Sequence, residues 1–488
     1  MRTVLLLSAL LANALCARAQ TLVSIEEIGS IDRLFIVSLA SSIGLTADDG
    51  IVYYRVAYTM DDLAGEQDTV TGLFVRPVNA DGQGRYPTLV SQHGTTQTKF
   101  DVPSLLPVNI FTGSVPDLAY IYATQGYSVL APDFLNMGDD EGFHPYVHAR
   151  TEALAALRML EALESAPEYT DVRGDGLYLT GYSQGGHASM ALHELLIEEY
   201  PDIEIAAAAH NSGPYSVSGV MLREVALGDE PFAVPAFIPY TALAYQEVYG
   251  DLYTDLTDIF RPAYAGNIAA FRDGYETGAV TLGTLNQQLL DSLAAAGTPG
   301  LTKGIFAPGF LAEIEAGTNV EFLRALRDND TYDFANPTPT RLHYCTADEQ
   351  VSFRNSIVAE DSLNARGAAD TRAVDVAPAE SHGGCILPAV LASIEFFASV
   401  REASATGEIP GAAAWRWVHT AEGLRVYTDD AAGAYRLQVI DAAGRVSAAL
   451  PYRSGELVPL ARQAAGWTAV RLVDAEGRSA SRVIATNR

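Results

Sequence analysis

Lysine is almost absent from this chain of 488 residues: Lys99 and Lys303 are the only two, and every other basic residue is an arginine. Basic residues are scarce altogether, because 60 Asp and Glu stand against 31 Lys and Arg and the formal charge is −29. A protein that binds nucleic acid needs a basic surface, and so does one that docks on anionic lipid through charge. The composition therefore argues against a nucleic-acid partner and against electrostatic membrane binding.

Long apolar runs are missing beyond the amino terminus. None of the later stretches reaches the roughly 18 uninterrupted apolar residues of a membrane-spanning helix. The amino terminus has a basic Arg2, an apolar run over residues 4–15 and a small-x-small triplet at 17–19. This pattern is typical of a secretory signal peptide over residues 1–19, and it predicts a secreted or cell-surface protein that begins at Gln20.

Cysteine is scarce as well, with three residues, and Cys16 lies within the predicted signal peptide. Cys345 and Cys385 remain, an even number in a chain exported to an oxidising compartment. We therefore expect a disulfide between them, with two free buried thiols as the alternative. A bridge across these 40 residues would stabilise the fold by roughly 3–4 kcal/mol in the chain-entropy model.

Residues 51–214 alternate between strand-like and helix-like segments. Runs rich in Val, Tyr and Phe at 51–58 and 69–75 predict strands, whereas 147–163 and 184–199 have apolar residues at helical spacing. The same alternation resumes between residues 341 and 400. Strands separated by helices indicate a mostly parallel sheet covered on both faces, so the predicted fold class is α/β.

Two further parts of the sequence, residues 215–337 and 414–488, lack this alternation of strands and helices. Residues 215–337 have helical periodicity, and we expect them to form a helical cap inserted between two strands, over a pocket. The main domain, cap included, would cover residues 20–402, and a linker would cover 403–413. Residues 414–488 contain ten arginines against seven acidic residues, and their short strands and turns predict a small β-sandwich.

A G-x-S-x-G motif at residues 181–185 follows a predicted strand and precedes a predicted helix. Such a sharp turn needs glycines beside it, because side chains would collide there, and it lifts the Ser183 hydroxyl above the sheet edge. The helix that begins at Gln184 points backbone N–H groups and the positive end of its dipole at the same place. Ser183 is therefore the candidate nucleophile, and the Gln184 N–H is a candidate oxyanion donor.

A serine hydroxyl needs a base, and the base needs a carboxylate to orient it. With this elbow the acid follows the serine in the chain and the histidine comes last. Of the nine histidines, only His382 lies just after the last predicted strand of the alternating part. The glycines beside it predict a loop there. The acid should follow the strand at 341–345, which makes Asp348 the candidate and Glu349 the alternative. The expected disulfide would tie the acid loop to the base loop.

A second oxyanion donor is expected from the loop after an early strand. Residues 91–96, Ser-Gln-His-Gly-Thr-Thr, form this loop. Gly94 lets the backbone approach a substrate, and the Thr95 N–H is the candidate donor. This chemistry needs no metal and no organic cofactor, and we expect neither.

The order of these motifs resembles that of the α/β-hydrolases: an HG-T loop, a GYSQGG elbow, a helical insertion, an acid and a final histidine. The segments 131–134, 138–139 and 144–146, which read APDF, GD and HPY, are similar to the secretory-lipase branch, which includes fungal lipase A-type enzymes. The resemblance spans about residues 50–400. It implies hydrolysis of a small-molecule or lipid ester, with the acyl chain held under the cap.

Two alternatives to an ester hydrolase stay open. A serine peptidase of the same fold would need a cap carboxylate, such as Asp251, Asp255 or Glu276, to hold the substrate amine. A surface binding protein could have kept the fold without activity, although an intact set of serine, acid and histidine argues against it.

Residues 414–488 resemble the C-terminal sorting domain of the type IX secretion pathway. The similarity rests on the segments GAYRL at 433–437, DAAGR at 441–445 and GWTAVRL at 466–472. It implies a β-sandwich that makes transient contact with outer-membrane secretion machinery. A generic accessory β module is the alternative.

Overall fold

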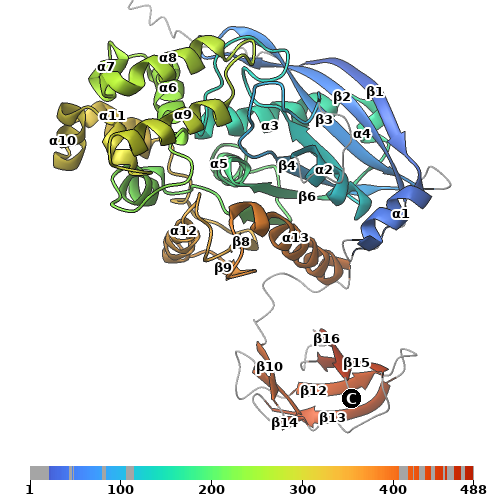
Figure 1. Ribbon diagram of the computed structural model, residues 1–488. Helices are drawn as coiled ribbons and strands as arrows, with labels where there is room; N and C mark the ends of the chain where they lie inside the picture. Colours follow the sequence, from blue (N-terminus) through green and yellow to red (C-terminus); the bar gives the residue numbers. More distant parts are fainter. Residues whose placement is uncertain are drawn as a thin grey trace, which may run out of the picture. The chain divides into compact units, whose positions relative to one another are not determined.

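The computed structural model describes residues 21–405, apart from 43–44, 46, 48, 80–83 and 106–114, and the strands between residues 416 and 486. By its contacts the chain divides into two units, Met1–Phe396 and Phe397–Arg488 (Figure 1). The predicted signal peptide, most of the predicted linker and the predicted turns at 441–444 and 474–477 lie outside the described residues.

The first unit is built on a nine-stranded sheet with the order β1-β2-β3-β5-β4-β6-β7-β8-β9. Its first four members in that order pair antiparallel, and all pairs from β5 to β9 are parallel. The expected mostly parallel sheet is confirmed. The strands are β1 (Leu22–Ile31), β2 (Gly50–Asp61), β3 (Gln67–Val78), β4 (Tyr86–Gln92), β5 (Ser128–Pro132), β6 (Arg173–Tyr182), β7 (Ala207–Asn211), β8 (Thr340–Tyr344) and β9 (Thr371–Asp375).

Helices cover both faces of this sheet, because its central strands are apolar on both sides. Side chains of α3 and α5 pack into one core with those of β2 to β6, and α12 packs beside α5. On the other face, Tyr122 of α2 bonds to Thr180 of β6, and Ser393 of α13 bonds to His343 of β8. The helices outside the cap are α1 (Arg33–Ser42), α2 (Val115–Thr124), α3 (Ala149–Leu163), α4 (Pro167–Thr170), α5 (Gln184–Glu199), α12 (Arg354–Ala365) and α13 (His382–Ala405).

The segment between β7 and β8 is helical and forms its own apolar core beside the sheet (Figure 1). Aromatic and leucine side chains such as Tyr240, Phe271 and Leu285 fill this core. We call this segment the cap. Its elements are a π-helix η1 (Val217–Ala226), α6 (Phe237–Tyr249), α7 (Leu256–Ile259), α8 (Pro262–Gly274), α9 (Leu282–Ala295), a 3-10 helix η2 (Thr302–Ile305), α10 (Pro308–Ala316) and α11 (Val320–Arg327).

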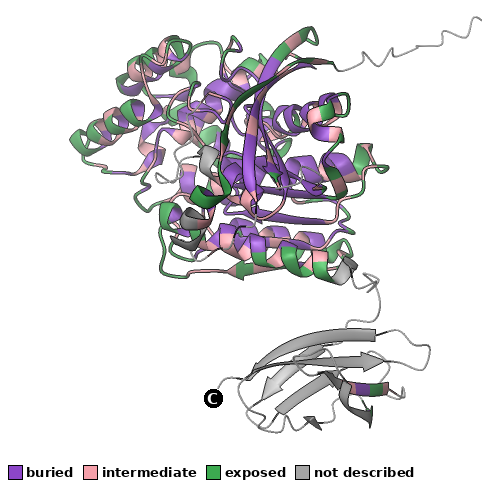
Figure 2. Ribbon diagram, turned by 90° about the vertical axis from the view of Figure 1, so that its right-hand side faces the viewer, coloured by how far each residue is buried: buried purple, intermediate pink, exposed green. Residues whose placement is uncertain are grey.

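Two features of the first unit differ from the sequence-based expectation. The strand β1 and the helix α1 were not expected, and β1 is mostly exposed at the edge of the sheet, so its sequence lacks a buried face to recognise (Figure 2). The loop predicted around His382 was wrong, because α13 begins at that residue. Ser381 caps the start of this helix and offsets the low helix propensity of the two glycines. Its carbonyl oxygen accepts from the Cys385 N–H, and its hydroxyl accepts from the Gly384 N–H.

α13 also contains the one helical stretch, among the residues that the structure describes, that is long and apolar enough to cross a membrane: His382–Glu402. This property rests on the length and composition of the helix alone. Cys385, Ala389 and Phe397 of this helix are fully buried, so part of its apolar surface is used in packing within the protein.

The second unit contains two antiparallel sheets, with the orders β10-β11-β14 and β13-β12-β15-β16. The short strands expected within residues 414–488 are confirmed. The face-to-face packing of a sandwich stays a prediction. The strands are β10 (Arg416–Thr420), β11 (Gly423–Tyr427), β12 (Tyr435–Ile440), β13 (Val446–Tyr452), β14 (Leu457–Val458), β15 (Gly466–Val473) and β16 (Ser479–Thr486).

Candidate active site

Ser183 lies at the sharp turn between β6 and α5 with φ 61° and ψ −123°, a conformation that side-chain-bearing residues rarely adopt. Glycines make the turn sterically feasible. A Cβ on Gly181 would lie 2.1 Å from the Gly185 carbonyl oxygen, and one on Gly185 would lie 1.9 Å from the Gln92 carbonyl oxygen. The G-x-S-x-G spacing therefore follows from close packing of β4 and α5 on the turn.

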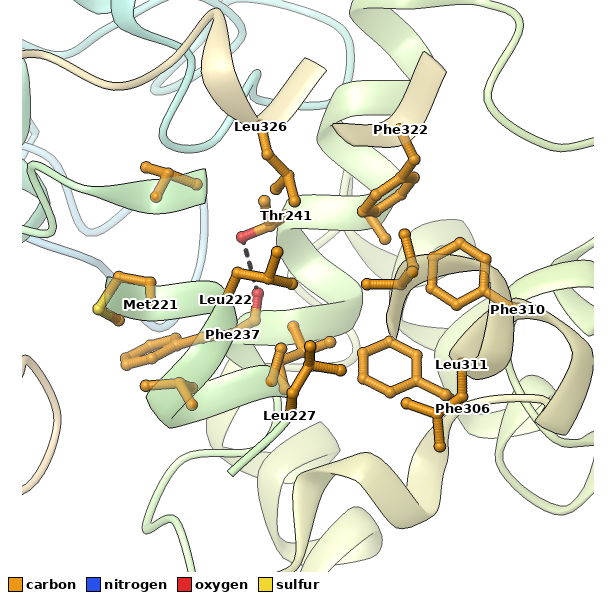
Figure 3. Close-up of a pocket in the computed structure, with 16 residues that line it drawn as sticks. Met221, Leu222, Leu227, Phe237, Thr241, Phe306, Phe310, Leu311, Phe322 and Leu326 are labelled. Carbon is orange, nitrogen blue, oxygen red and sulfur yellow. Dashed lines mark hydrogen bonds between the residues drawn. The ribbon is translucent and has the colours of Figure 1, made fainter. Parts of the chain in front are cut away.

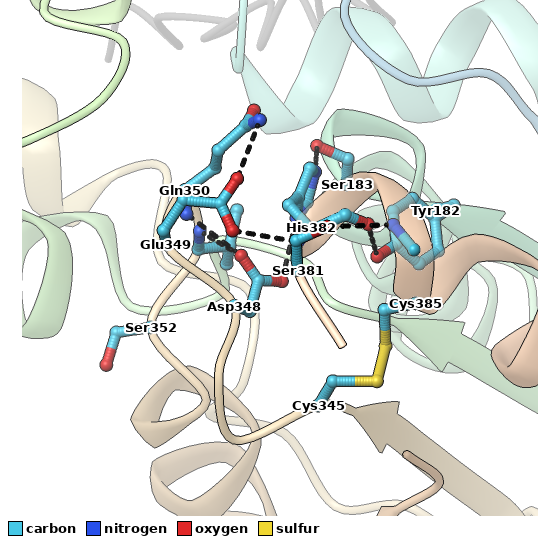
Figure 4. Close-up of polar contacts among 12 residues, drawn as sticks. Tyr182, Ser183, Cys345, Asp348, Glu349, Gln350, Ser352, Ser381, His382 and Cys385 are labelled. Atoms are coloured by element: carbon cyan, nitrogen blue, oxygen red, sulfur yellow. Dashed lines mark hydrogen bonds and ion pairs between the residues drawn. A yellow bond between two sulfur atoms is a disulfide. The ribbon is translucent and has the colours of Figure 1, made fainter. Parts of the chain in front are cut away.

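The structure brings Ser183, His382 and Asp348 together, although Ser183 and His382 are 199 residues apart (Figure 4). The His382 Nε2 is 2.9 Å from the Ser183 Oγ, and its Nδ1 is 2.7 Å from the Asp348 Oδ2. A carboxylate beside Nδ1 favours the tautomer whose Nε2 is free to accept the serine proton. Ser183, His382 and Asp348 thus form one continuous series of hydrogen bonds.

Further contacts hold Asp348 and His382 in place (Figure 4). The Asp348 Oδ1 accepts the backbone N–H groups of Gln350 and Val351, which fixes the carboxylate. Glu349 does not contact the imidazole; its Oε2 accepts the backbone N–H of His382 at 3.0 Å. The Tyr182 hydroxyl donates to the His382 carbonyl oxygen at 2.6 Å.

Cys345 and Cys385 form a disulfide between the end of β8 and the first turn of α13. Both cysteines are completely buried beside Tyr182. Because Cys345 lies three residues before Asp348 and Cys385 three residues after His382, the bridge joins the loop of the acid to the helix of the base.

The loop predicted to hold the second oxyanion donor lies directly against the elbow. A Cβ on Gly94 would be 3.1 Å from the Tyr182 carbonyl oxygen and 3.5 Å from the Ser183 Cβ, so the backbone of this loop passes beside the serine. The next residue, Thr95, has its hydroxyl 2.9 Å from the Tyr146 hydroxyl. Gln184 is the first residue of α5, as expected from the motif.

A buried glutamate beside the elbow, Glu152, was missed at the level of sequence. Glu152 of α3 is fully buried, and its carboxylate accepts from the Gln184 Nε2 at 2.8 Å and lies 2.9 Å from the His187 Nδ1. The Nε2 of His144 lies 2.8 Å from the same Gln184 nitrogen. No signal in the sequence singles out Glu152, because the segment 147–163 also contains Arg150, Arg158 and Glu161, and charged residues usually occupy solvent-exposed positions.

Burial changes the titration of some of these groups. It lowers the pKa of His144 to about 3, because desolvation penalises the imidazolium, so this ring is neutral. Desolvation also raises the pKa of Asp133, whose carboxylate accepts from Thr71 and from the Ser104 N–H. Asp133, directly after β5, thus links β3 to the segment that follows β4. No group of three His, Cys, Asp or Glu suited to a metal occurs among the described residues.

The cap encloses an apolar pocket with a cavity volume of about 100 Å³ (Figure 3). Thr241 is its one polar lining residue, and the Thr241 hydroxyl bonds to the Phe237 carbonyl oxygen within α6. The opposite side of α6 carries Tyr240, which stacks on Tyr146 with ring centroids 4.2 Å apart. The pocket is lined by Val217, Met221, Leu222, Val225, Ala226, Leu227, Phe237, Ile238, Thr241, Ala242, Phe306, Phe310, Leu311, Ile314, Phe322 and Leu326.

Solved structures similar to this fold are hydrolases. A protein described as a candidate hydrolase from Legionella pneumophila is 25% identical, with a TM-score of 0.65, over 78% of this chain and 98% of its own. The rice cell wall degrading esterase LipA from Xanthomonas oryzae is 23% identical, with a TM-score of 0.65, over 80% of this chain and 99% of its own. Candida antarctica lipase A in its closed state is 14% identical, with a TM-score of 0.55, over 79% and 82%.

Neither the models of protein families nor the curated proteins match this chain. The similarity to known proteins is therefore one of fold. The first unit has the α/β-hydrolase fold.

Proposed function

We propose that this protein is a secreted serine hydrolase that cleaves carboxylic esters. The observation that carries the proposal is the unbroken chain of contacts from Asp348 through His382 to Ser183 at a strained elbow. The similar esterase and lipase structures support the reaction class.

In the proposed reaction Ser183 is the nucleophile and His382 is the base. The Ser183 Oγ attacks the ester carbonyl carbon while its proton passes to the His382 Nε2, and the carbonyl electron pair moves onto oxygen. The backbone N–H groups of Gln184 and Thr95 stabilise that oxyanion. The proton then goes from His382 to the leaving alcohol, which departs and leaves an acyl-enzyme.

Water completes the cycle by the same steps. His382 takes a proton from water, the hydroxide adds to the acyl carbon, and Ser183 leaves with the proton from His382. Asp348 accepts from the His382 Nδ1 and stabilises the imidazolium that forms in each half-reaction. No step requires a metal or an organic cofactor.

The cap pocket supports an acyl group as the part of the substrate it would hold. Its lining is apolar apart from one threonine whose hydroxyl is already bonded, so a charged or sugar group would lose hydrogen bonds there. The peptidase alternative is less well supported, because Glu276 already pairs with Lys99 and Asp255 caps α7. The unbroken triad geometry argues against an inactive binding protein.

Export is part of the proposal and rests on the sequence. The predicted signal peptide at 1–19 would direct the chain out of the cytoplasm, and a disulfide near the triad fits an oxidising compartment. Residues 414–488 would act as the sorting domain.

The test is hydrolysis of p-nitrophenyl esters from acetate to palmitate by the wild type and by Ser183→Ala. We expect the variant to lose at least about 1,000-fold in kcat, because it lacks the nucleophile. If the wild type cleaves no ester but cleaves aminoacyl or dipeptidyl amides, the peptidase is correct. If it cleaves neither, the protein is not a hydrolase of these substrates and the proposal is wrong.

A second variant tests the pocket. Leu311→Trp would fill part of the cavity from α10, so we expect it to lower kcat/KM for octanoate by about ten-fold or more and to leave acetate nearly unchanged. Leu34→Trp, an exposed change of the same kind outside the cap, is the matched control. Equal losses on acetate and octanoate would show that acyl chains do not enter this pocket.

A further inference from the structure

The segment 144–147 contacts both residues that are predicted to donate to the oxyanion. On one side, the Tyr146 hydroxyl lies 2.9 Å from the Thr95 hydroxyl. On the other side, the His144 Nε2 lies 2.8 Å from the Nε2 of the Gln184 side chain. The two donors come from different parts of the sheet, after β4 and after β6, and this one segment lies against both.

Each of these contacts has a defined direction. The Nδ1 of His144 faces the Leu135 carbonyl oxygen at 3.0 Å, which can only accept, so Nδ1 carries the proton and Nε2 accepts from Gln184. The same Gln184 nitrogen donates its other hydrogen to the Glu152 Oε1 at 2.8 Å. Both hydrogens of the amide are therefore used, and the side chain of Gln184 has one orientation.

Glu152 links this amide to the segment itself. Its Oε1 also accepts the backbone N–H of Val147 at 3.1 Å, and its Oε2 lies 2.9 Å from the His187 Nδ1. Val147 has a φ of 55°, a strained value for a β-branched residue that persists only where the surroundings hold it. The Tyr245 hydroxyl holds the Val147 carbonyl oxygen at 3.0 Å from the cap side.

An oxyanion hole works because its donors are held in place before charge develops. A displacement of a few tenths of an ångström weakens a hydrogen bond to the transition state more than one to the ground state. Residues that fix the donors should therefore affect kcat more than KM.

We propose that Tyr146, His144 and Glu152 are positioning residues for the oxyanion hole: Tyr146 holds Thr95, while His144 and Glu152 hold Gln184. This inference rests on the proposed ester hydrolysis. None of the three touches the substrate, and each acts through a residue whose backbone N–H does.

Tyr146→Phe is the direct test. It removes the hydroxyl that contacts Thr95 and keeps the ring stacked on Tyr240. We expect kcat for p-nitrophenyl butyrate to fall about ten-fold with KM within about two-fold, a smaller loss than deletion of a donor itself would give. The matched control is Tyr58→Phe, which loses an equally buried hydroxyl that donates to the Ala155 carbonyl oxygen in α3. It should lower the thermal midpoint and leave kcat unchanged.

A trifluoromethyl ketone with a hexyl chain separates positioning from general loosening. The Ser183 Oγ bonds to its carbonyl carbon, the serine proton moves to His382, and the carbonyl electron pair becomes an oxyanion in the hole. Its inhibition constant should rise for Tyr146→Phe by the same factor by which kcat/KM falls, and stay constant for Tyr58→Phe.

Glu152 is tested by a conservative pair. Glu152→Gln can keep every contact. Its Oε1 can accept from Gln184 and Val147, its Nε2 can donate to the His187 Nδ1, and the His187 Nε2–H can donate to the Asn329 carbonyl oxygen. We expect it to retain at least about a third of kcat, and Glu152→Leu to lose about 100-fold or more.

The outcomes of these experiments distinguish the positioning roles from the proposed ester hydrolysis on which they rest. If the wild type hydrolyses esters and Tyr146→Phe behaves like Tyr58→Phe in kcat and ketone affinity, the positioning role of Tyr146 is wrong and the function stands. If Glu152→Gln is folded and as inactive as Glu152→Leu, the Glu152 role is wrong. A wild type without ester activity overturns both proposals.

Discussion

At the scale of single residues, steric and electrostatic constraints concentrate around the elbow. Gly181, Gly185 and Gly186 have no room for a Cβ, because each would meet backbone atoms of β4, β7 or the elbow itself within 2.5 Å. These contacts are to main chain and cannot be relieved by rotating a side chain. Other glycines, such as Gly309 in α10, have nothing within 4 Å of a Cβ.

Gly185→Ala should therefore abolish activity and destabilise the fold by about 3 kcal/mol or more, because its Cβ would overlap the Gln92 carbonyl. Gly309→Ala is the control, and it should raise the free energy of unfolding by about 0.5–1 kcal/mol through helix propensity. Urea unfolding and p-nitrophenyl butyrate hydrolysis measure both variants. A fully active, equally stable Gly185→Ala would contradict the packing of the elbow.

Asp140 provides a pH-dependent prediction. Burial raises its pKa to about 7, with a further contribution from the nearby Asp68 carboxylate. The folded protein thus binds this proton more tightly than the unfolded chain, so between about pH 4 and pH 7 stability falls as the pH rises. Asp140→Asn removes this loss. The free energy of unfolding of Asp140→Asn, relative to that of the wild type, should therefore be higher at pH 8 than at pH 5. We expect this difference to be ~1–2 kcal/mol, after allowance for partial solvent exposure.

Urea unfolding of both proteins at the two pH values checks this difference. Asparagine can still accept the Asn136 N–H that the aspartate accepts at 2.6 Å, so the hydrogen bond is kept. An identical stability difference at pH 5 and pH 8 would show that Asp140 does not titrate in this range.

At the scale of helices and strands, the regular elements of the sheet could be predicted and their buried polar contacts could not. Strand β6 and helix α5 are clear because apolar periodicity and the glycine turn are local signals. Strand β1 and the start of α13 were missed because one is an exposed edge and the other begins with two glycines. Neither has a periodic apolar pattern at the position concerned.

The disulfide acts at this scale, since it joins β8 to α13. Replacing both partners by Cys345→Ser and Cys385→Ser should lower the free energy of unfolding by roughly 3–4 kcal/mol, because the unfolded chain regains the freedom of a 40-residue separation. We expect a smaller effect on kcat, because Glu349 and Tyr182 still hold the backbone of His382. Urea unfolding of the double variant and of the wild type, both under non-reducing conditions, measures this.

At the scale of the whole molecule, the chain combines an acidic hydrolase unit with an arginine-rich C-terminal part. The described contacts of Ser183, Asp348 and His382 all lie within the first unit. A chain that ends at residue 405 contains every one of them.

A chain truncated after residue 405 should therefore keep kcat within about two-fold of the full-length protein, since no catalytic contact is removed. Expressed in a bacterium with type IX secretion, the truncated chain should stay inside the outer membrane while the full-length chain reaches the surface. Cell fractionation and ester hydrolysis measure the two properties separately. Surface export of the truncated chain would contradict the proposed sorting role.

The sequence by itself determined the α/β class, the strand–serine–helix elbow and the order of candidate serine, acid and histidine, because each depends on short-range periodicity and steric needs. Only the tertiary structure decided that the carboxylate beside the His382 imidazole belongs to Asp348 and that Glu349 holds the backbone instead. It also decided that Glu152 is buried under Gln184 and that Tyr146 reaches Thr95. The partner of a buried polar group is chosen by contacts between distant segments, and no local pattern encodes them.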